Sequence, residues 1–278
     1  MYHWQGLGAA FMLVTATMGA QAAERNWTVE GDALKISTSC ARTVDIQPSG
    51  AGHQVTIAAS ADKEGEISPL HVAGGSVATL DINGSSCYSA GLFSTHPTLT
   101  LTIRVPEGAA IEVKDGGITH YSIGAVGGTL NMSLSGAGGL KAVGATTLTL
   151  DLSGAGIADI GEAGEAHLHS SGAGDVTIHR LKGNIEARSS GAGNLTVDTV
   201  EASSVNLRTS GHADIKFGKG SIGNFTLESA GASDVVVNAT VGDAKVSVSG
   251  AGDVSFAKLT GHLDQSVAGI GKVKVIEH

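Results

Sequence analysis

The sequence predicts an all-β protein, a parallel β-helix of about 19 residues per coil with an N-terminal β cap. Three observations predict it. A glycine-rich tetrapeptide recurs at a fixed period, apolar and polar residues alternate beside each copy, and the repeat region contains no proline. A fixed period in this range is typical of solenoids, in which each repeat packs only on its neighbours. Beyond residue 22, no segment shows the sustained apolar spacing of three and four residues that indicates a helix.

The tetrapeptide is Ser-Gly-Ala-Gly, with degenerate copies at the glycines of positions 211, 231 and 269. Its first glycine falls at positions 136, 154, 172, 191, 211, 231, 250 and 269, so the period is nearly constant. One isolated copy begins at Ser49. Glycine permits positive φ and close approach of two backbones. We therefore expect the tetrapeptide at a corner of each coil.

Each copy is flanked by two short strand patterns. The sixth and fourth residues before each first glycine are apolar, except Gln265, and the residue between them is polar in every coil. Such alternation predicts a strand with one buried face. A second apolar pair follows the tetrapeptide, as at Val176 and Ile178. Each coil thus has at least two strands separated by a Gly-Ala-Gly corner.

Proline usage divides the chain near residue 107. All four prolines precede that point, and a continuous parallel ladder needs every backbone N–H as a donor. We assign residues 23–106 to an N-terminal β cap region and residues 107–278 to the β-helix repeat region; the alternative is that the two form one continuous domain. Within the first region, residues 98–105 alternate with period two, which favours an antiparallel or mixed cap.

Residues 1–22 predict a cleaved signal peptide. They contain no Asp, Glu, Lys or Arg, and Ala20-Gln21-Ala22 fits the small-x-small rule of signal peptidase. The apolar run is too short and too interrupted for a membrane span. We therefore expect an exported protein, periplasmic, cell-surface or extracellular, with no transmembrane span after cleavage.

Two cysteines, Cys40 and Cys87, remain in the exported chain. In an oxidising compartment they predict one structural disulfide. The alternative, a metal site built on both thiols, would need further ligands that no motif here supplies. The formal net charge of -9 excludes the basic surface typical of nucleic-acid-binding proteins.

A strand that closes on Val-Pro, residues 99–106 (Leu-Thr-Leu-Thr-Ile-Arg-Val-Pro), precedes the run of Ser-Gly-Ala-Gly-Asp-Val repeats. Over roughly residues 35–276 the chain resembles the exported bacterial family named for an auto-transporter adhesin, head GIN domain. That resemblance implies a β-rich protein with a β-helix-like repeat region and no established activity.

Acidic residues follow the corner in most coils, at Asp175, Asp214, Asp234 and Asp253, with Asn194 and Lys272 in the same column. Carboxylates beside tight glycine turns are ligands that Ca²⁺ prefers, so a calcium ladder is one interpretation. The other is that Asp and Asn suit turns and accept hydrogen bonds from local N–H groups. The spacing differs from that of calcium-binding nonapeptide repeats. We expect no other cofactor.

Small hydroxyl residues stand two positions before the glycine, at Ser170, Ser189, Thr209 and Ser229. A serine nucleophile needs a base within hydrogen-bond reach, but His169 and Ser170 are neighbours on a strand and point to opposite faces. We therefore interpret these hydroxyls as an inward, hydrogen-bonded ladder.

A charged column stands three positions before the glycine. His169, Arg188, Arg208 and Glu228 would stack on one outer face, and they are the candidate ligand-binding residues. The alternative is an ordinary solvated ladder of ion pairs. From Leu130 onward the only aromatic residues are Phe217, Phe225 and Phe256, all in apolar columns, so this face lacks stacking platforms.

Together these features predict a non-enzymatic, exported cell-envelope protein with an adhesin-like, scaffold or binding role. Its partner would be a cell-surface polysaccharide or an envelope protein. The alternative is a carbohydrate-binding or polysaccharide-degrading β-helix protein that uses the outer Arg/His/Glu face.

Overall fold

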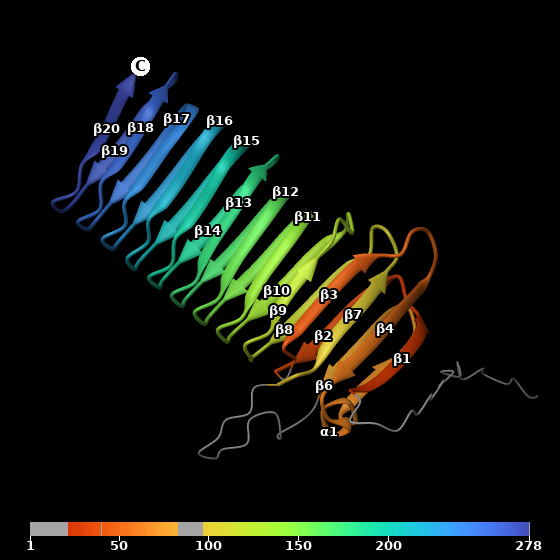
Figure 1. Ribbon diagram of the computed structural model, residues 1–278. Coiled ribbons are helices and arrows are strands. Elements are labelled where there is room, and N and C mark those ends of the chain that lie inside the picture. Colours follow the sequence, from red (N-terminus) through yellow and green to blue (C-terminus); the bar gives the residue numbers. More distant parts are fainter. Residues whose placement is uncertain (1–21, 40, 83–96, 278) are drawn as a thin grey trace, which may run out of the picture.

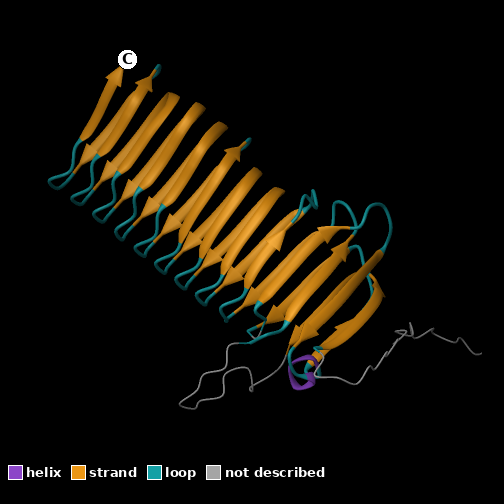
Figure 2. Cartoon of the chain, in the orientation of Figure 1, coloured by secondary structure: helices purple, strands orange, loops and turns teal. Residues whose placement is uncertain are grey.

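Strands form almost all of the computed structural model, which describes residues 22–39, 41–82 and 97–277 (Figures 1 and 2). The chain winds into a parallel β-solenoid of about nine turns with roughly 19 residues per coil. Among the described residues there is one short helix, α1 (Glu64–Ile67). The predicted fold class is confirmed.

From residue 129 onward, eleven strands stack in chain order (Figure 1). They are β10 (Thr129–Leu134), β11 (Gly139–Leu152), β12 (Ile157–Ser170), β13 (Asp175–Leu181), β14 (Ile185–Ser189), β15 (Leu195–Thr209), β16 (Ile215–Ser229), β17 (Val235–Val248), β18 (Val254–Leu259), β19 (Leu263–Val267) and β20 (Val273–Glu277). All their pairings with one another are parallel.

The long strands cross from one side of the solenoid to the other. In β11, residues 139–142 pair with β9 (His120–Ile123), whereas residues 147–152 pair with β10. We call the side that precedes each tetrapeptide wall A, which includes β10, β14 and β19. The side that follows it is wall B, which includes β9, β13, β18 and β20. The tetrapeptides form one row of corners between the walls.

The register matches the predicted columns. The sixth residue before each first glycine pairs with its equivalent in the next coil, from Leu130 opposite Leu148 to Ala244 opposite Leu263. The apolar residues of both walls form one continuous buried core. In it Phe225 packs edge-to-face on Phe217 and Phe256, with ring centroids 6.2 and 5.2 Å apart. Edge-to-face contacts are favourable for aromatic rings.

Only one of the two expected reasons for glycine at the corner holds, the close approach of two backbones. The first glycines from position 136 to position 250 do not have positive φ, so that part of the expectation is wrong. Their requirement is close approach: an added Cβ at these positions would lie 1.6–1.9 Å from a backbone oxygen of the preceding coil. Any side chain there would push two coils apart.

The remaining nine strands precede residue 129. They are β1 (Ala23–Glu30), β2 (Ala33–Thr38), β3 (Thr43–Pro48), β4 (Gln54–Ala61), β5 (Leu70–Ala73), β6 (Val77–Ile82), β7 (Thr100–Val105), β8 (Ala110–Asp115) and β9. Their spatial order differs from their chain order. In wall A, β2 lies between β6 and β8, and in wall B, β3 lies between β7 and β9, all in parallel. The solenoid ladder therefore continues across residue 106.

Antiparallel strands close this end of the solenoid. In wall A, β5 pairs with β6, and in wall B, β4 pairs with β7 and β1 pairs with β4. The end is thus a mixed β cap. At its junction with the repeats the buried Asp115 carboxylate accepts hydrogen bonds from the Gly117 N–H (2.6 Å) and the Tyr121 hydroxyl (2.7 Å).

Residues 1–21 of the expected signal peptide lie outside the described residues, as do Cys40 and Cys87 and hence their predicted disulfide. Within the described part of the chain, no helix has the length and apolar character needed to cross a membrane.

Candidate functional site

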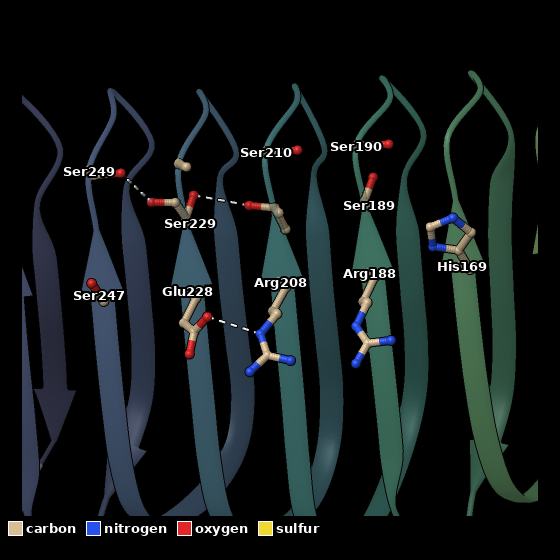
Figure 3. A pocket seen from close by; sticks show the side chains of 12 residues that line it. His169, Arg188, Ser189, Ser190, Arg208, Ser210, Glu228, Ser229, Ser247 and Ser249 are labelled. Atoms are coloured by element: carbon tan, nitrogen blue, oxygen red, sulfur yellow. Dashed lines mark hydrogen bonds and ion pairs between the residues drawn. The ribbon is translucent and has the colours of Figure 1, made fainter.

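The four candidate ligand-binding residues lie side by side on the outer face of wall A (Figure 3). His169 comes from β12, Arg188 from β14, Arg208 from β15 and Glu228 from β16. Each is directly opposite the next in the parallel ladder. The repeat period returns each outward strand position to the same face in the next coil, and the structure brings all four residues together.

A hollow of about 480 Å³ lies between this row and the corners, and all four residues line it. Its other lining residues are small and mostly hydroxylated: Ser189, Ser190, Thr209, Ser210, Ser229, Ala230, Ser247 and Ser249. The hollow exists because short side chains at the corner end stand beside long ones from Arg188, Arg208 and Glu228. A second hollow of about 180 Å³ adjoins it on the strands, and its lining includes Glu186, Asn206 and Thr226.

Two arginines occupy neighbouring positions, and each has one carboxylate partner. The Arg188 Nη2 donates to Glu186 Oε1 (2.6 Å), and the Arg208 Nε donates to Glu228 Oε2 (2.9 Å). Glu228 raises the pKa of the Arg208 guanidinium, and that guanidinium lowers the pKa of the Glu228 carboxyl. The two arginine side chains are 55% and 57% exposed, so both remain accessible to a ligand. In Figure 3 their guanidinium groups point the same way from adjacent strands.

The hydroxyl column beneath this face is only partly as predicted. The Thr209 hydroxyl donates to Ser229 Oγ (3.0 Å), and Ser249 Oγ donates to the Ser229 carbonyl (3.3 Å). The prediction of a ladder is wrong at Ser170 and Ser189, whose Oγ atoms are buried without a hydrogen-bond partner.

The physical reason for this exception is a small void. Ser170 and Ser189 border a cavity of about 30 Å³ whose lining also includes Leu168, Ala187 and Leu195. In its column, the small Ala187 lies between two larger residues, Leu168 in the preceding coil and Leu207 in the next. Its missing side-chain volume leaves the interior of this coil loosely filled, and the lining of the cavity is mostly apolar.

The Asp and Asn side chains that follow the corner accept hydrogen bonds from backbone N–H groups. Asp175 accepts a hydrogen bond from the Asn194 N–H (3.0 Å), and Asn194 accepts one from the Asp214 N–H (3.1 Å). Asp234 and Asp253 likewise accept from the N–H groups of Asp253 and Lys272, both at 2.9 Å. The partners in each bond are 19 or 20 residues apart, so these side chains link successive coils instead of making the local turn bonds of the second interpretation. Within the described ranges, no group of three or more His, Cys, Asp or Glu residues could hold a metal ion.

Sequence reasoning missed two clusters. Ser247 and Ser249 extend the hollow, and Ser247 could have been found because it stands three positions before Gly250, in the column of Glu228. On wall B, the His179 ring lies between Asp198 (2.7 Å) and Asp159 (3.0 Å), which raises the His179 pKa through these hydrogen bonds. This cluster could have been found from the sequence, because Asp198 and Asp159 lie 19 and 20 residues from His179, one coil away in each direction.

Residues 181–278 match the profile of a family described as "Putative auto-transporter adhesin, head GIN domain". The predicted resemblance is confirmed over these residues, which include Arg188, Arg208 and Glu228. The family description supports an adhesin-like role and names no biochemical activity.

Two solved structures share the fold. The crystal structure of a "putative adhesin" from Parabacteroides distasonis is 15% identical, with a TM-score of 0.58, and the match covers 92% of this chain and 98% of that one. A "putative adhesin" from Parabacteroides merdae is 16% identical, with a TM-score of 0.52 and coverage of 92% and 96%. At these identities the likeness concerns the fold alone. No curated protein has a sequence that matches this chain.

Proposed function

We propose that this chain is a non-enzymatic, exported cell-envelope protein that binds an acidic cell-surface polysaccharide through the hollow around Arg188 and Arg208. The observation that carries the proposal is the hollow itself, which lies on the face expected to bind a ligand and is lined by all four candidate residues. An adhesin-like role agrees with the family description of residues 181–278.

The charge arrangement favours an acidic ligand. On a face whose role is solvation alone, opposite charges are expected to alternate across strands, because like charges directly opposite one another are destabilising. Arg188 and Arg208 are directly opposite one another. A carboxylate or sulfate placed between them would relieve this repulsion and accept hydrogen bonds from guanidinium N–H groups left over from the ion pairs with Glu186 and Glu228.

The hydroxyl lining favours a polysaccharide over a peptide. Ser190, Ser210 and Ser249 occupy the same position in three of four neighbouring coils, with Ala230 in the fourth, and Ser247 lies in the same coil as Ser249; the coils are stacked at the strand spacing, roughly 5 Å. A linear polymer of hydroxylated units can use such a repeated set in several registers. The lining extends over five neighbouring coils, from His169 to Ser249, which suits an internal stretch of a chain.

Two features support a binding role over hydrolysis. Glycoside hydrolysis by paired carboxyls needs one acid with a raised pKa, whereas Arg208 lowers the pKa of Glu228. Nucleophilic catalysis by serine needs a base in contact with the hydroxyl, whereas His169 and Ser170 are neighbours on β12 and point to opposite faces of the strand.

The test is binding of residues 23–278 to immobilised polygalacturonate, with dextran as the uncharged control polymer. We expect binding to polygalacturonate that weakens with salt, and a loss of about tenfold or more in the R188Q/R208Q double variant, since each charge-assisted hydrogen bond contributes about 1.5–3 kcal/mol. The matched control is Lys182→Gln, which removes a cation from an ion pair with Glu162 (2.7 Å) outside the hollow.

Equal binding by the double variant, or equal binding to dextran, would refute the proposal. The alternative function, polysaccharide degradation, predicts that incubation with the native protein shortens the polymer and that Arg208→Ala abolishes this activity. Export is tested separately by fractionation of cells that produce the full chain, with the processed protein expected outside the cytoplasm.

A further inference from the structure

The two ends of the solenoid differ in how they are closed. At the N-terminal end, β5 covers the edge of wall A, and β4 and β1 cover that of wall B. At the other end, β19 pairs only with β17, and β20 pairs only with β18. Within the described residues, the outer edges of β19 and β20 have no strand partner, and Figure 1 shows them as the last pair of the stack. Such edges are templates for pairing with another chain.

The open end is also apolar. Seven large hydrophobic residues are exposed in the described chain, and three of them, Val267, Ile270 and Ile276, lie in its last eleven residues. Leu263, Val273 and Val275 belong to the inward columns but are only partly buried. Among the described residues, none covers the cross-section of the core at the last coil.

Charges at this end are unequal between the two walls. Asp264 lies on β19, whereas Lys272 precedes β20 and Lys274 lies on it. None of the three forms an ion pair in the described part of the chain, whereas Glu277 on the same edge is held by Lys258 Nζ (2.9 Å). The edge of wall A is thus acidic and that of wall B is basic.

We propose that this end binds a second copy of the chain head-to-head, with β19 of each copy pairing with β20 of the other. A second copy fits because its own open end has the same cross-section, so inward columns meet inward columns. Because both copies use the same end, the assembly closes as a two-fold dimer and does not extend further.

Geometry and charge both favour the pairing of β19 in one copy with β20 in the other. The two walls run in opposite directions (Figure 2), so a two-fold axis parallel to the strands places β19 of one copy antiparallel to β20 of the other. Full overlap sets Val267 opposite Val273 and Gln265 opposite Val275 of the second copy, all inward, and it sets Asp264 diagonal to Lys274. The alternative pairing of β20 with β20 would bring the lysines of the two copies together, which is unfavourable.

The interface is small. Two antiparallel pairs of five residues provide on the order of ten ladder hydrogen bonds, and Gln265 makes the centre of wall A polar. We therefore expect a concentration-dependent dimer with a dissociation constant in the micromolar range (about 8 kcal/mol) rather than an obligate one.

Sedimentation of residues 23–278 over a range of protein concentrations tests the proposal. The native protein should shift from monomer to dimer, and the I270K/I276K double variant should stay monomeric, because these exposed side chains lie at the open end. The matched control, V143K/I157K, places the same charges on exposed residues at the side of the solenoid and should dimerise like the native protein.

A charge exchange then tests the pairing. Asp264→Lys and Lys274→Asp should each weaken the dimer, and the two together should restore it. A native protein that is monomeric at all concentrations, or a dimer insensitive to I270K/I276K, overturns the proposal. A dimer that is lost in I270K/I276K but not restored by the exchange overturns the pairing of β19 with β20.

Discussion

Replacement of a corner glycine is the sharpest test of how the coils fit together. An ideal Cβ on Gly191 would lie 1.7 Å from the Gly172 carbonyl oxygen in the preceding coil, whereas real Cβ atoms essentially never approach within 3.0 Å. In Gly191→Ala the two coils must separate locally by roughly 1 Å, because a close-packed interior leaves no slack to absorb the new atom. The separation breaks the hydrogen bonds from Ser190 N to Ser170 O (2.8 Å) and from Ala192 N to Gly172 O (3.0 Å).

The expected cost follows from these contacts. Two backbone hydrogen bonds contribute about 1 kcal/mol each, and burial of their unpaired groups adds to the loss. Alanine offsets about 0.4–1 kcal/mol of this by restricting the unfolded chain. We expect Gly191→Ala to lower the free energy of unfolding by about 2–4 kcal/mol. With a urea dependence near 3 kcal/mol/M, the urea midpoint should fall by about 1 M.

The assay is urea unfolding of residues 23–278 followed by far-ultraviolet circular dichroism. Gly65→Ala is the matched control, because a Cβ at Gly65 meets nothing within 4 Å and its φ is not positive. That variant should unfold at the native midpoint or slightly above it. If Gly191→Ala also unfolds at the native midpoint, close approach of the coils is not the reason for glycine at the corner.

Three further predictions concern other parts of the chain. Asp115→Ala leaves the buried Tyr121 hydroxyl and the Gly117 N–H without their acceptor and should lower the free energy of unfolding by about 3 kcal/mol, measured by the same urea titration; an unchanged midpoint contradicts it. Ala187→Val fills part of the small cavity and should raise stability by about 1 kcal/mol, whereas Ala166→Val, at a position that is 0% exposed, should lower it; similar effects of both would argue against the cavity. His179 has a folded pKa raised by its two carboxylates, so its contribution is fully present below the unfolded pKa and is lost as pH rises through the folded pKa. The stability difference between the native protein and His179→Gln should therefore be larger at about pH 5.5 than at about pH 8.5, and a difference that is the same at both pH values would refute the role of the carboxylates.

The repeats could be predicted from the sequence because every coil has the same local pattern of strands and corner. A nearly constant period, alternation on the strands and glycine at the corner place Leu130 over Leu148 and Arg188 over Arg208 without any long-range information. The candidate site was predictable for the same reason, since outward residues at equal offsets must stack. The hollow itself was not, because it depends on the volumes of neighbouring side chains such as Ser190 beside Arg188.

The N-terminal region had no such regularity. Nothing in the local pattern of residues 33–48 shows that β2 and β3 insert between strands that come later in the chain. The void beside Ala187 was equally hidden, because alanine satisfies the apolar pattern of its column and only packing shows that it is too small. Local rules determine the columns, and tertiary packing determines which of them are well filled.

The insertion of β2 and β3 between later strands has a consequence for how the protein is made. Each of these two strands needs one neighbour from residues 77–105 and another from residues 110–123. During synthesis, which begins at the N-terminus, the first stable coils cannot form until about residue 123 is available. These contacts are long-range and slow to form. Afterwards each coil needs only the one before it, so folding can advance one coil at a time along the growing rod.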